Sequence, residues 1–175
     1  SLAITEKAVG SQHPDMATRL NNLASLYRDQ GRYAAAEPLY KQSLAIWEKA
    51  LGPQHPNVGA GLNNLAELYN KQRRYAAAEP LFKRSLAILE KNFGPEHSRG
   101  AASLNNLAFL YDDQGRFANA EPLYQRSLSI REKAFGPRHP SVAESLNNLA
   151  GLYEVQEQED KALGFIRQAT AIYRD

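Results

Sequence analysis

The stretch Leu20-Asn21-Asn22-Leu23-Ala24-Ser25-Leu26-Tyr27 contains a motif that recurs along the chain. Its core, Asn-Asn-Leu-Ala, is found again at intervals of 42 residues, and the copies begin at Asn21, Asn63, Asn105 and Asn147. A fixed period of this length is typical of repeat proteins, in which each copy forms one small structural unit. The sequence therefore predicts several copies of one unit and not a single irregular domain.

Each copy has the pattern of two helices. The apolar residues of the quoted stretch follow the i, i+3, i+4, i+7 spacing of an amphipathic helix, which we predict over about residues 15–30. Gly31 ends this helix, because glycine readily adopts the left-handed backbone of a helix C-terminus. A second helix is predicted over residues 33–51, and Gly52-Pro53 stops it. Pro38 lies inside the second helix, but the residues before it favour helix, so we expect that helix to be continuous.

An isolated helix pair cannot bury both of its faces, whereas stacked pairs cover one another. We therefore predict an all-α solenoid of stacked antiparallel helix pairs. Residues 1–4 match residues 43–46, so residues 1–10 are predicted to be the trailing helix of a preceding repeat. The predicted repeats span residues 15–52, 57–94, 99–136 and 141–175. The last repeat is atypical at residues 157–164, as expected of a capping repeat.

Composition excludes several classes of function. The chain has 175 residues, with 21 Lys and Arg against 19 Asp and Glu, so its net charge is +2. This balance gives no reason to expect a nucleic acid or a membrane surface as partner. There is no cysteine, no apolar run long enough to span a bilayer and no signal-peptide pattern, so we expect a cytoplasmic protein.

No residue pattern indicates catalysis or a cofactor. The histidines at positions 13, 55, 97 and 139 lie one repeat apart, about 10 Å in a stack of helices. Zinc needs its ligands about 2.0–2.1 Å from one ion, so we expect a structural role for these histidines in the loops. No glycine-rich phosphate loop follows a strand, and no serine has a histidine and an aspartate in a catalytic arrangement. We predict a non-enzyme without metal or cofactor.

These motifs resemble the tetratricopeptide repeat. The order Leu-x-x-Leu-Ala-x-x-Tyr, then Gly31, Tyr33, Ala36 and Tyr40, fits that pattern, and the 42-residue period with Ala-Glu-Pro-Leu and Gly-Pro-x-His-Pro is similar to the kinesin light chain type. The resemblance implies a right-handed α–α superhelix that binds peptides or proteins and is not itself an enzyme. Arg73 and the stretch 157–164 depart from the pattern, which leaves open whether tight turns form in the second and fourth repeats.

The paired asparagines are the first candidates for a binding site. In a solenoid of helix pairs the first helix of each repeat lines the concave groove, and both asparagines point away from the core of their own repeat. A row of amide groups can hydrogen-bond an extended peptide backbone without reading its side chains. The alternative is that one asparagine of each pair bonds a neighbouring helix and holds the stack together. The candidates are Asn21, Asn63, Asn105 and Asn147, with Asn22, Asn64, Asn106 and Asn148.

Specificity is expected from groove positions that differ between repeats. These positions carry mixed or basic residues in the first two repeats and acidic residues later, so we predict a partner with basic residues facing the third and fourth repeats. Phe109 is either the floor of a pocket or a residue packed on a neighbouring helix. The candidates are Arg28, Glu67, Asn70, Lys71, Phe109, Asp112, Asp113 and Glu154.

The leading functional hypothesis is a module that binds a peptide or protein partner in this groove. The alternative is a structural or self-assembling array that spaces or regulates an attached effector domain. The identity of the partner is not readable from the sequence.

Overall fold

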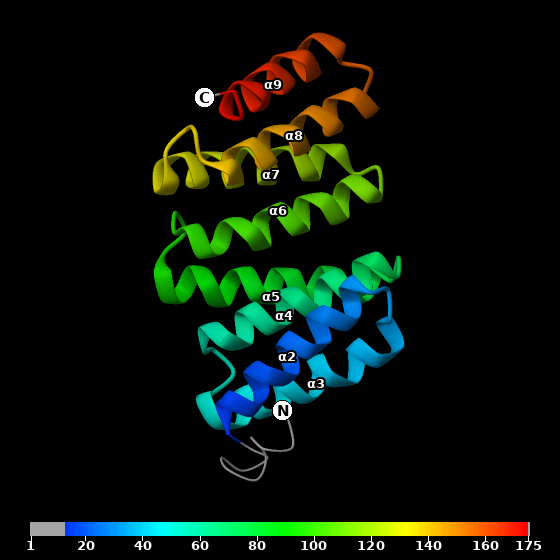
Figure 1. The fold of residues 1–175 in the computed structure, drawn as a ribbon, viewed down its shortest axis with the longest axis vertical. Coiled ribbons are helices and arrows are strands. Elements are labelled where there is room, and N and C mark those ends of the chain that lie inside the picture. Colours follow the sequence, from blue (N-terminus) through cyan, green and yellow to red (C-terminus); the bar gives the residue numbers. More distant parts are fainter. Residues whose placement is uncertain (1–12, 175) are drawn as a thin grey trace. The chain divides into compact units, whose positions relative to one another are not determined.

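The computed structural model describes residues 13–174, which form helices joined by short loops (Figure 1). The predicted trailing helix at residues 1–10 lies outside the described residues. Odd-numbered helices carry the second-helix sequence of each repeat, and even-numbered helices carry the first. The helices are α2 (Pro14–Asp29), α3 (Tyr33–Leu51), α4 (Pro56–Lys71), α5 (Tyr75–Phe93), α6 (Ser98–Asp113), α7 (Phe117–Phe135), α8 (Pro140–Val155) and α9 (Glu159–Ile172).

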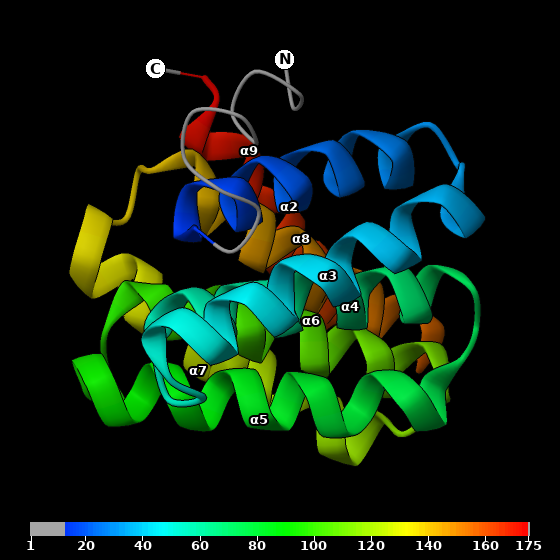
Figure 2. The same cartoon turned by 90° about the horizontal axis from the view of Figure 1, so that it is seen from below.

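The chain divides into two compact units; unit 1 ends at Asn92 and unit 2 begins at Phe93. In unit 1, helices α2 and α3 form an antiparallel pair joined by a short turn, and α4 packs against α3 (Figure 2). In unit 2, the same relations join α6 to α7, α7 to α8 and α8 to α9. The predicted helix pairs are therefore present, and the predicted bounds of the first two helices agree with the observed ones within a residue.

A histidine begins each of the first helices. His13 Nδ1 accepts a hydrogen bond from the backbone N–H of Asp15 at 3.2 Å, and His55 Nδ1 accepts from Asn57 N at 3.1 Å. His97 and His139 make the same contact with Arg99 N and Ser141 N. The imidazole thus satisfies one of the N–H groups that a helix N-terminus leaves without an intrahelical partner. This is the structural role of the periodic histidines.

Each first helix ends in a Schellman turn. In α2, the N–H of Arg32 bonds the carbonyl oxygen of Tyr27 at 2.8 Å, and Gly31 has a φ of +73°. The second and fourth repeats form the same turn without glycine, because Arg73 and Glu157 adopt φ values of +57° and +59°. A left-handed backbone costs a residue with a side chain about 1–2 kcal/mol. The rest of the repeat therefore imposes this turn where the local sequence does not favour it.

A buried serine ties the two helices of a pair together. Ser43 Oγ in α3 donates to the carbonyl oxygen of Ala17 in α2 at 2.7 Å, and the serine side chain has no exposure. Ser85 and Ser127 repeat the bond toward the carbonyl oxygens of Gly59 and Ala101. The helices α3, α5 and α7 are each continuous across their internal proline, as predicted for Pro38, and α9 has glycine at this position.

The core differs at one pair of equivalent positions. In unit 1, the buried Trp47 ring packs against Gly61, where an added Cβ would lie 2.9 Å from the ring. In unit 2, the equivalent residues are Arg131 and Ser145. The buried guanidinium of Arg131 donates to Ser145 Oγ at 3.0 Å and to the carbonyl oxygen of Ser141 at 2.8 Å. A packed aromatic ring and a hydrogen-bonded guanidinium thus occupy the same place in two repeats.

Candidate functional site

The paired asparagines join first helices of adjacent repeats. In unit 1, Asn64 Nδ2 on α4 donates to Asn21 Oδ1 on α2 at 3.1 Å. In unit 2, Asn148 Nδ2 on α8 donates to Asn105 Oδ1 on α6 at 2.8 Å. The first asparagine of one repeat is therefore the acceptor for the second asparagine of the next. This geometry supports the alternative in which the asparagines hold the stack together, because each of these four side chains uses one hydrogen bond for a contact between repeats.

The same asparagines retain unused hydrogen-bonding groups. The side-chain N–H groups of Asn21 and Asn105 donate to no partner within residues 13–174. Asn147 and Asn22 are exposed and also have no side-chain partner in the described chain. Asn63 differs, because its Nδ2 donates to Glu67 Oε1 at 2.8 Å. Accessible donors for a ligand backbone are thus present at Asn21, Asn22 and Asn147, whereas Asn63 and Asn105 are buried, at 8% and 6% exposure.

In unit 1 the variable positions form a self-paired cluster. The Arg28 guanidinium on α2 bonds the Glu67 carboxylate on α4, and Arg28 also pairs with Asp29 at 3.0 Å. Tyr40 OH on α3 lies 2.9 Å from Ser25 Oγ. Burial lowers the pKa of Arg28, but the neighbouring Glu67, Tyr40 and Asp29 raise it by more, so it stays above the ordinary value. Charges in this cluster satisfy one another within the protein.

In unit 2 the same positions lack this pairing. Asp112 stands in place of Arg28, and Gly151 stands in place of Glu67. Each residue of unit 2 is compared with the residue 84 positions earlier in unit 1. Phe109 replaces Ser25 and is 47% exposed, so it is not fully packed against a neighbouring helix, and its role as the floor of a pocket stays a prediction. An added Cβ at Gly151 would meet no atom within 4 Å. The acidic patch of unit 2, defined as Asp112, Asp113 and Glu154, therefore borders open space.

Electrostatics in unit 2 reflect the missing cation. Burial raises the pKa of Asp112, and the neighbouring Asp113 carboxylate raises it further. Burial also raises the pKa of Tyr124 well above its usual range, and the charges of Asp112 and Asp113 add to this effect. Burial is the larger cause of both shifts, and the carboxylates near these two groups act in the same direction.

The remaining predicted residues lie at varied depths. Asn70 was expected to lie on the open groove surface, but it is only 8% exposed and therefore buried. Asn106 is partly buried, whereas Lys71, Asp113 and Glu154 are exposed. Neither Asp112 nor Glu154 forms an ion pair with a residue in the described part of the chain. The exposed acids and Phe109 therefore make unit 2 the more accessible of the two candidate surfaces.

One polar contact between repeats was not predicted. Glu37 forms an i, i+4 ion pair with Lys41 at 2.7 Å. Its carboxylate also accepts from Tyr69 OH at 3.0 Å and from the Arg74 guanidinium at 2.8 Å, both in the next repeat. The bond with Lys41 is the largest influence lowering the pKa of Glu37. In unit 2 the equivalent Glu121 accepts from Tyr153 OH at 2.6 Å.

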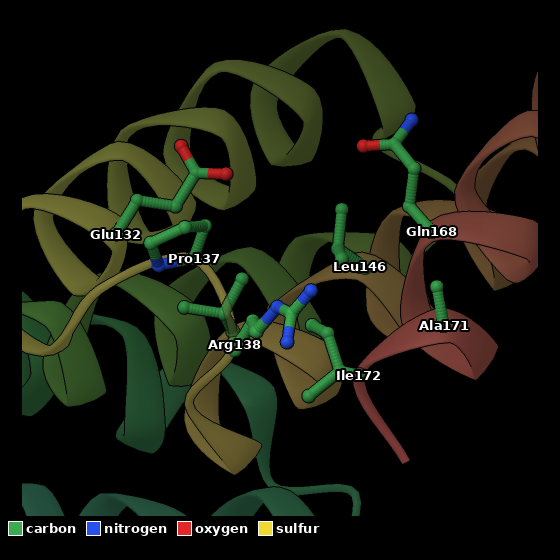
Figure 3. A pocket seen from close by; sticks show the side chains of 8 residues that line it. Glu132, Pro137, Arg138, Leu146, Gln168, Ala171 and Ile172 are labelled. Atoms are coloured by element: carbon green, nitrogen blue, oxygen red, sulfur yellow. The ribbon is translucent and has the colours of Figure 1, made fainter. Parts of the chain in front are cut away.

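A cavity of about 320 Å³ opens in unit 2 between the end of α7, the start of α8 and the end of α9 (Figure 3). Its floor is apolar, with Leu146 and Ile172, and Glu132 and Gln168 lie at its rim. At the equivalent place in unit 1, Arg84 bonds Glu48 Oε1 at 2.7 Å and thereby bridges two repeats. Gln168 replaces that arginine in the last repeat, so the bridge is missing and the cavity stays open.

Residues 13–174 lack two further features. They contain no group of three or more His, Asp or Glu side chains that could hold a metal ion. None of their helices is both long and apolar enough to cross a membrane.

The sequence was compared with known proteins and solved structures. It matches the model of the tetratricopeptide repeat family over residues 1–49, 15–91, 58–133 and 99–175. No curated protein sequence matches the chain significantly.

Solved structures with similar folds include kinesin light chain-like proteins. A Podosopora anserina putative kinesin light chain with nearly identical TPR-like repeats is 30% identical, with a TM-score of 0.77 over 98% of this chain and 81% of that one. BtubC (BKLC) from P. vanneervenii is 26% identical, with a TM-score of 0.81 over 92% of this chain. This chain spans 65% of the BtubC chain.

A more distant structure, aspartyl phosphate phosphatase F from Bacillus subtilis, is 14% identical and shares the fold, with a TM-score of 0.79 over 91% of this chain and 40% of that one. These likenesses confirm the predicted all-α fold of stacked helix pairs. The chain belongs to the tetratricopeptide repeat family, and its repeats are of the kinesin light chain-like type.

Proposed function

We propose that the chain is a binding module that holds an extended peptide segment of a partner protein along the open faces of its first helices. Tetratricopeptide repeats generally act as protein-interaction or scaffold modules. The proposed ligand is hydrogen-bonded by asparagine side chains, and its basic residues face the acidic patch of unit 2.

The observation that carries this proposal is the contrast in charge pairing. Arg28 and Glu67 neutralise each other in unit 1, whereas Asp112 and Glu154 have no cationic partner within the described residues. Unpaired carboxylates beside an exposed Phe109 ring offer both charge and apolar contact area to a ligand. Long-range attraction between opposite charges also speeds association, so such binding weakens as salt rises.

The test is binding of the chain to an array of random dodecapeptides, followed by affinity measurements on the strongest peptides. We expect basic peptides to be enriched. Reversing the charges with Asp112→Lys, Asp113→Lys and Glu154→Lys together is expected to remove most of that binding. If the triple variant bound every selected peptide as well as the original chain, the groove proposal would be wrong.

Asn147→Ala tests the asparagine contribution separately. This side chain is exposed and has no partner in the described chain, so its removal should leave the fold intact. We expect a several-fold loss of peptide affinity, corresponding to one hydrogen bond. Asn92→Ala is a matched control away from the first helices, because Asn92 bonds the backbone at Gln54 and Ile88.

The alternative function is a self-assembling array that spaces an attached domain. The cavity beside α9 favours it, together with the exposed side chains of Leu163 on that helix and of Tyr173 just after its end. Sedimentation over a range of protein concentrations tests it. Oligomers that persist in the Asp112, Asp113 and Glu154 charge-reversal variant, without any peptide binding by the original chain, would favour assembly over recognition.

A further inference from the structure

The two units share one register between neighbouring first helices. The bond from Asn64 to Asn21 in unit 1 has its counterpart 84 residues later in the bond from Asn148 to Asn105. In unit 1 this register brings Arg28 onto Glu67. The same register in unit 2 sets Asp112 opposite Gly151. Unit 2 therefore lacks a cation, and it also lacks the side chain that would otherwise fill the space.

A tyrosine hydroxyl in unit 2 has also lost its partner. Tyr40 OH contacts Ser25 Oγ in unit 1, but Phe109 stands at the serine position in unit 2 and offers no oxygen. The equivalent Tyr124 is 1% exposed, and its hydroxyl forms no hydrogen bond within residues 13–174. The Tyr124 hydroxyl is not among the fully buried polar atoms that lack a partner, so it is the accessible end of an otherwise buried side chain and can bond an incoming polar group.

We propose that unit 2 holds an arginine-specific subsite, in which a ligand guanidinium occupies the space beside Gly151 and bonds Asp112 and Tyr124. This subsite rests on the proposed peptide-binding function and names the side chain that the ligand presents. The ligand arginine takes the role that Arg28 plays for Glu67 in unit 1. Burial is the main cause of the raised pKa values of Asp112 and Tyr124, and neighbouring carboxylates add to it, so a cation bound here would favour the ionised form of Asp112.

The chemistry of the subsite favours arginine over lysine. A guanidinium has five N–H donors in a plane, so one group can reach a carboxylate and a phenol oxygen together. Its flat face also stacks on aromatic rings, and the Phe109 ring is exposed one turn before Asp112 on α6. A lysine ammonium is a compact charge that is more strongly hydrated. It therefore stacks less well on the ring and bridges the carboxylate and phenol oxygens less well.

The experiment uses the 175-residue chain and an array of nonapeptides with a fixed central residue and random flanks. The central residue is arginine, lysine, citrulline or glutamate, and citrulline keeps the shape of arginine without its charge. We expect arginine peptides to give the strongest signal and citrulline and glutamate peptides to lose it. The best arginine peptide and its citrulline twin are then compared in solution by fluorescence polarisation.

Three variants place the effect in the subsite. Asp112→Asn is expected to weaken the arginine peptide about tenfold or more, since it removes a charge-assisted bond, and Tyr124→Phe to weaken it a few-fold. The double variant Asp112→Arg with Gly151→Glu installs the pair of unit 1, so its own guanidinium fills the space and binding is lost. Glu132→Gln on α7 is the matched control and should bind normally. Circular dichroism melting checks that each variant is folded.

The outcomes separate the subsite from the wider proposal. Equal binding of arginine and citrulline peptides, stronger binding of lysine peptides, or full binding by the folded double variant would each overturn the arginine subsite while peptide binding stands. A complete absence of peptide binding by the original chain would overturn the proposed function, and the subsite with it. Loss of arginine binding in the folded double variant, with normal binding by the control, supports both.

Discussion

In unit 1, the positions of Arg28 and Glu67 carry opposite charges that bond each other, whereas in unit 2 the same positions carry Asp112 and Gly151. The backbone around them is equivalent, since the asparagine bonds between first helices are present in both units. Repetition of the scaffold thus makes each unit a control for the other. The comparison teaches that the few residues that differ decide whether a surface is satisfied by the protein or left for a ligand.

The largest effect is expected where the two units differ in the core. Gly61→Ser places the residue of unit 2 into unit 1, where an added Cβ would lie 2.9 Å from Trp47 and Leu44 side-chain atoms. We expect the free energy of unfolding to fall by about 1–3 kcal/mol because of this overpacking. Urea denaturation measures the change. Adding Trp47→Arg should recover part of the loss, and an unchanged midpoint for Gly61→Ser alone would contradict the explanation.

The next effect concerns the carboxylates that join repeats. Glu37→Gln removes the ion pairs with Lys41 and Arg74, so we expect the free energy of unfolding to fall by about 1 kcal/mol. Glu121→Gln should cost less, because Tyr153 and Gln125, which bond Glu121, are neutral. The pKa of Glu37 is lowered from 4.5, so its stabilisation is present above that pH and is lost as pH falls through the lowered value. Unfolding at pH 7 and pH 3 tests this, and a cost of Glu37→Gln that stays equal at both would refute it.

The ionised Asp112 carboxylate is expected to affect stability in the opposite direction to that of Glu37. Its pKa is raised from 3.8, so the folded state holds this proton more tightly than the unfolded state does, and the ionised carboxylate destabilises the fold at neutral pH. Asp112→Asn should therefore raise the free energy of unfolding at pH 7 by a few tenths to about 1 kcal/mol. The gain should vanish as pH falls through the raised pKa. A loss of stability at pH 7 would show that Asp112 has a stabilising partner.

The smallest effect is expected at the cavity beside α9. Gln168→Arg restores the residue that bonds Glu48 in unit 1, here opposite Glu132 (Figure 3). A partly exposed pair of this kind contributes about 0.2–1 kcal/mol, so the melting temperature should rise slightly. Gln168→Lys is a charge-matched control that lacks the planar guanidinium. If the arginine variant melted no higher than the original chain, the missing bridge would not explain the open cavity.

The sequence determined the architecture because the signals for it are local and repeated. The helix pairs and their bounds were predicted from the apolar spacing, the glycine and proline breakers and the 42-residue period. The periodic histidines indicated where the loops lie. The turns at Arg73 and Glu157 show the limit of such signals, since tertiary packing held a left-handed backbone without glycine. The composition of the site residues was also readable, including the change toward acidic side chains in the later repeats.

Only the tertiary structure decided which of those residues are already used. The bonds from Arg28 to Glu67, from Asn64 to Asn21 and from Tyr69 to Glu37 join residues more than 30 positions apart. Such contacts depend on the register between stacked helices, and a helical period places a residue on a face without fixing what faces it from the next repeat. The sequence therefore predicted the surface and its charges. Packing between repeats decided that Arg28 and Glu67 pair in unit 1, whereas Asp112 and Glu154 in unit 2 form no ion pair with a described residue.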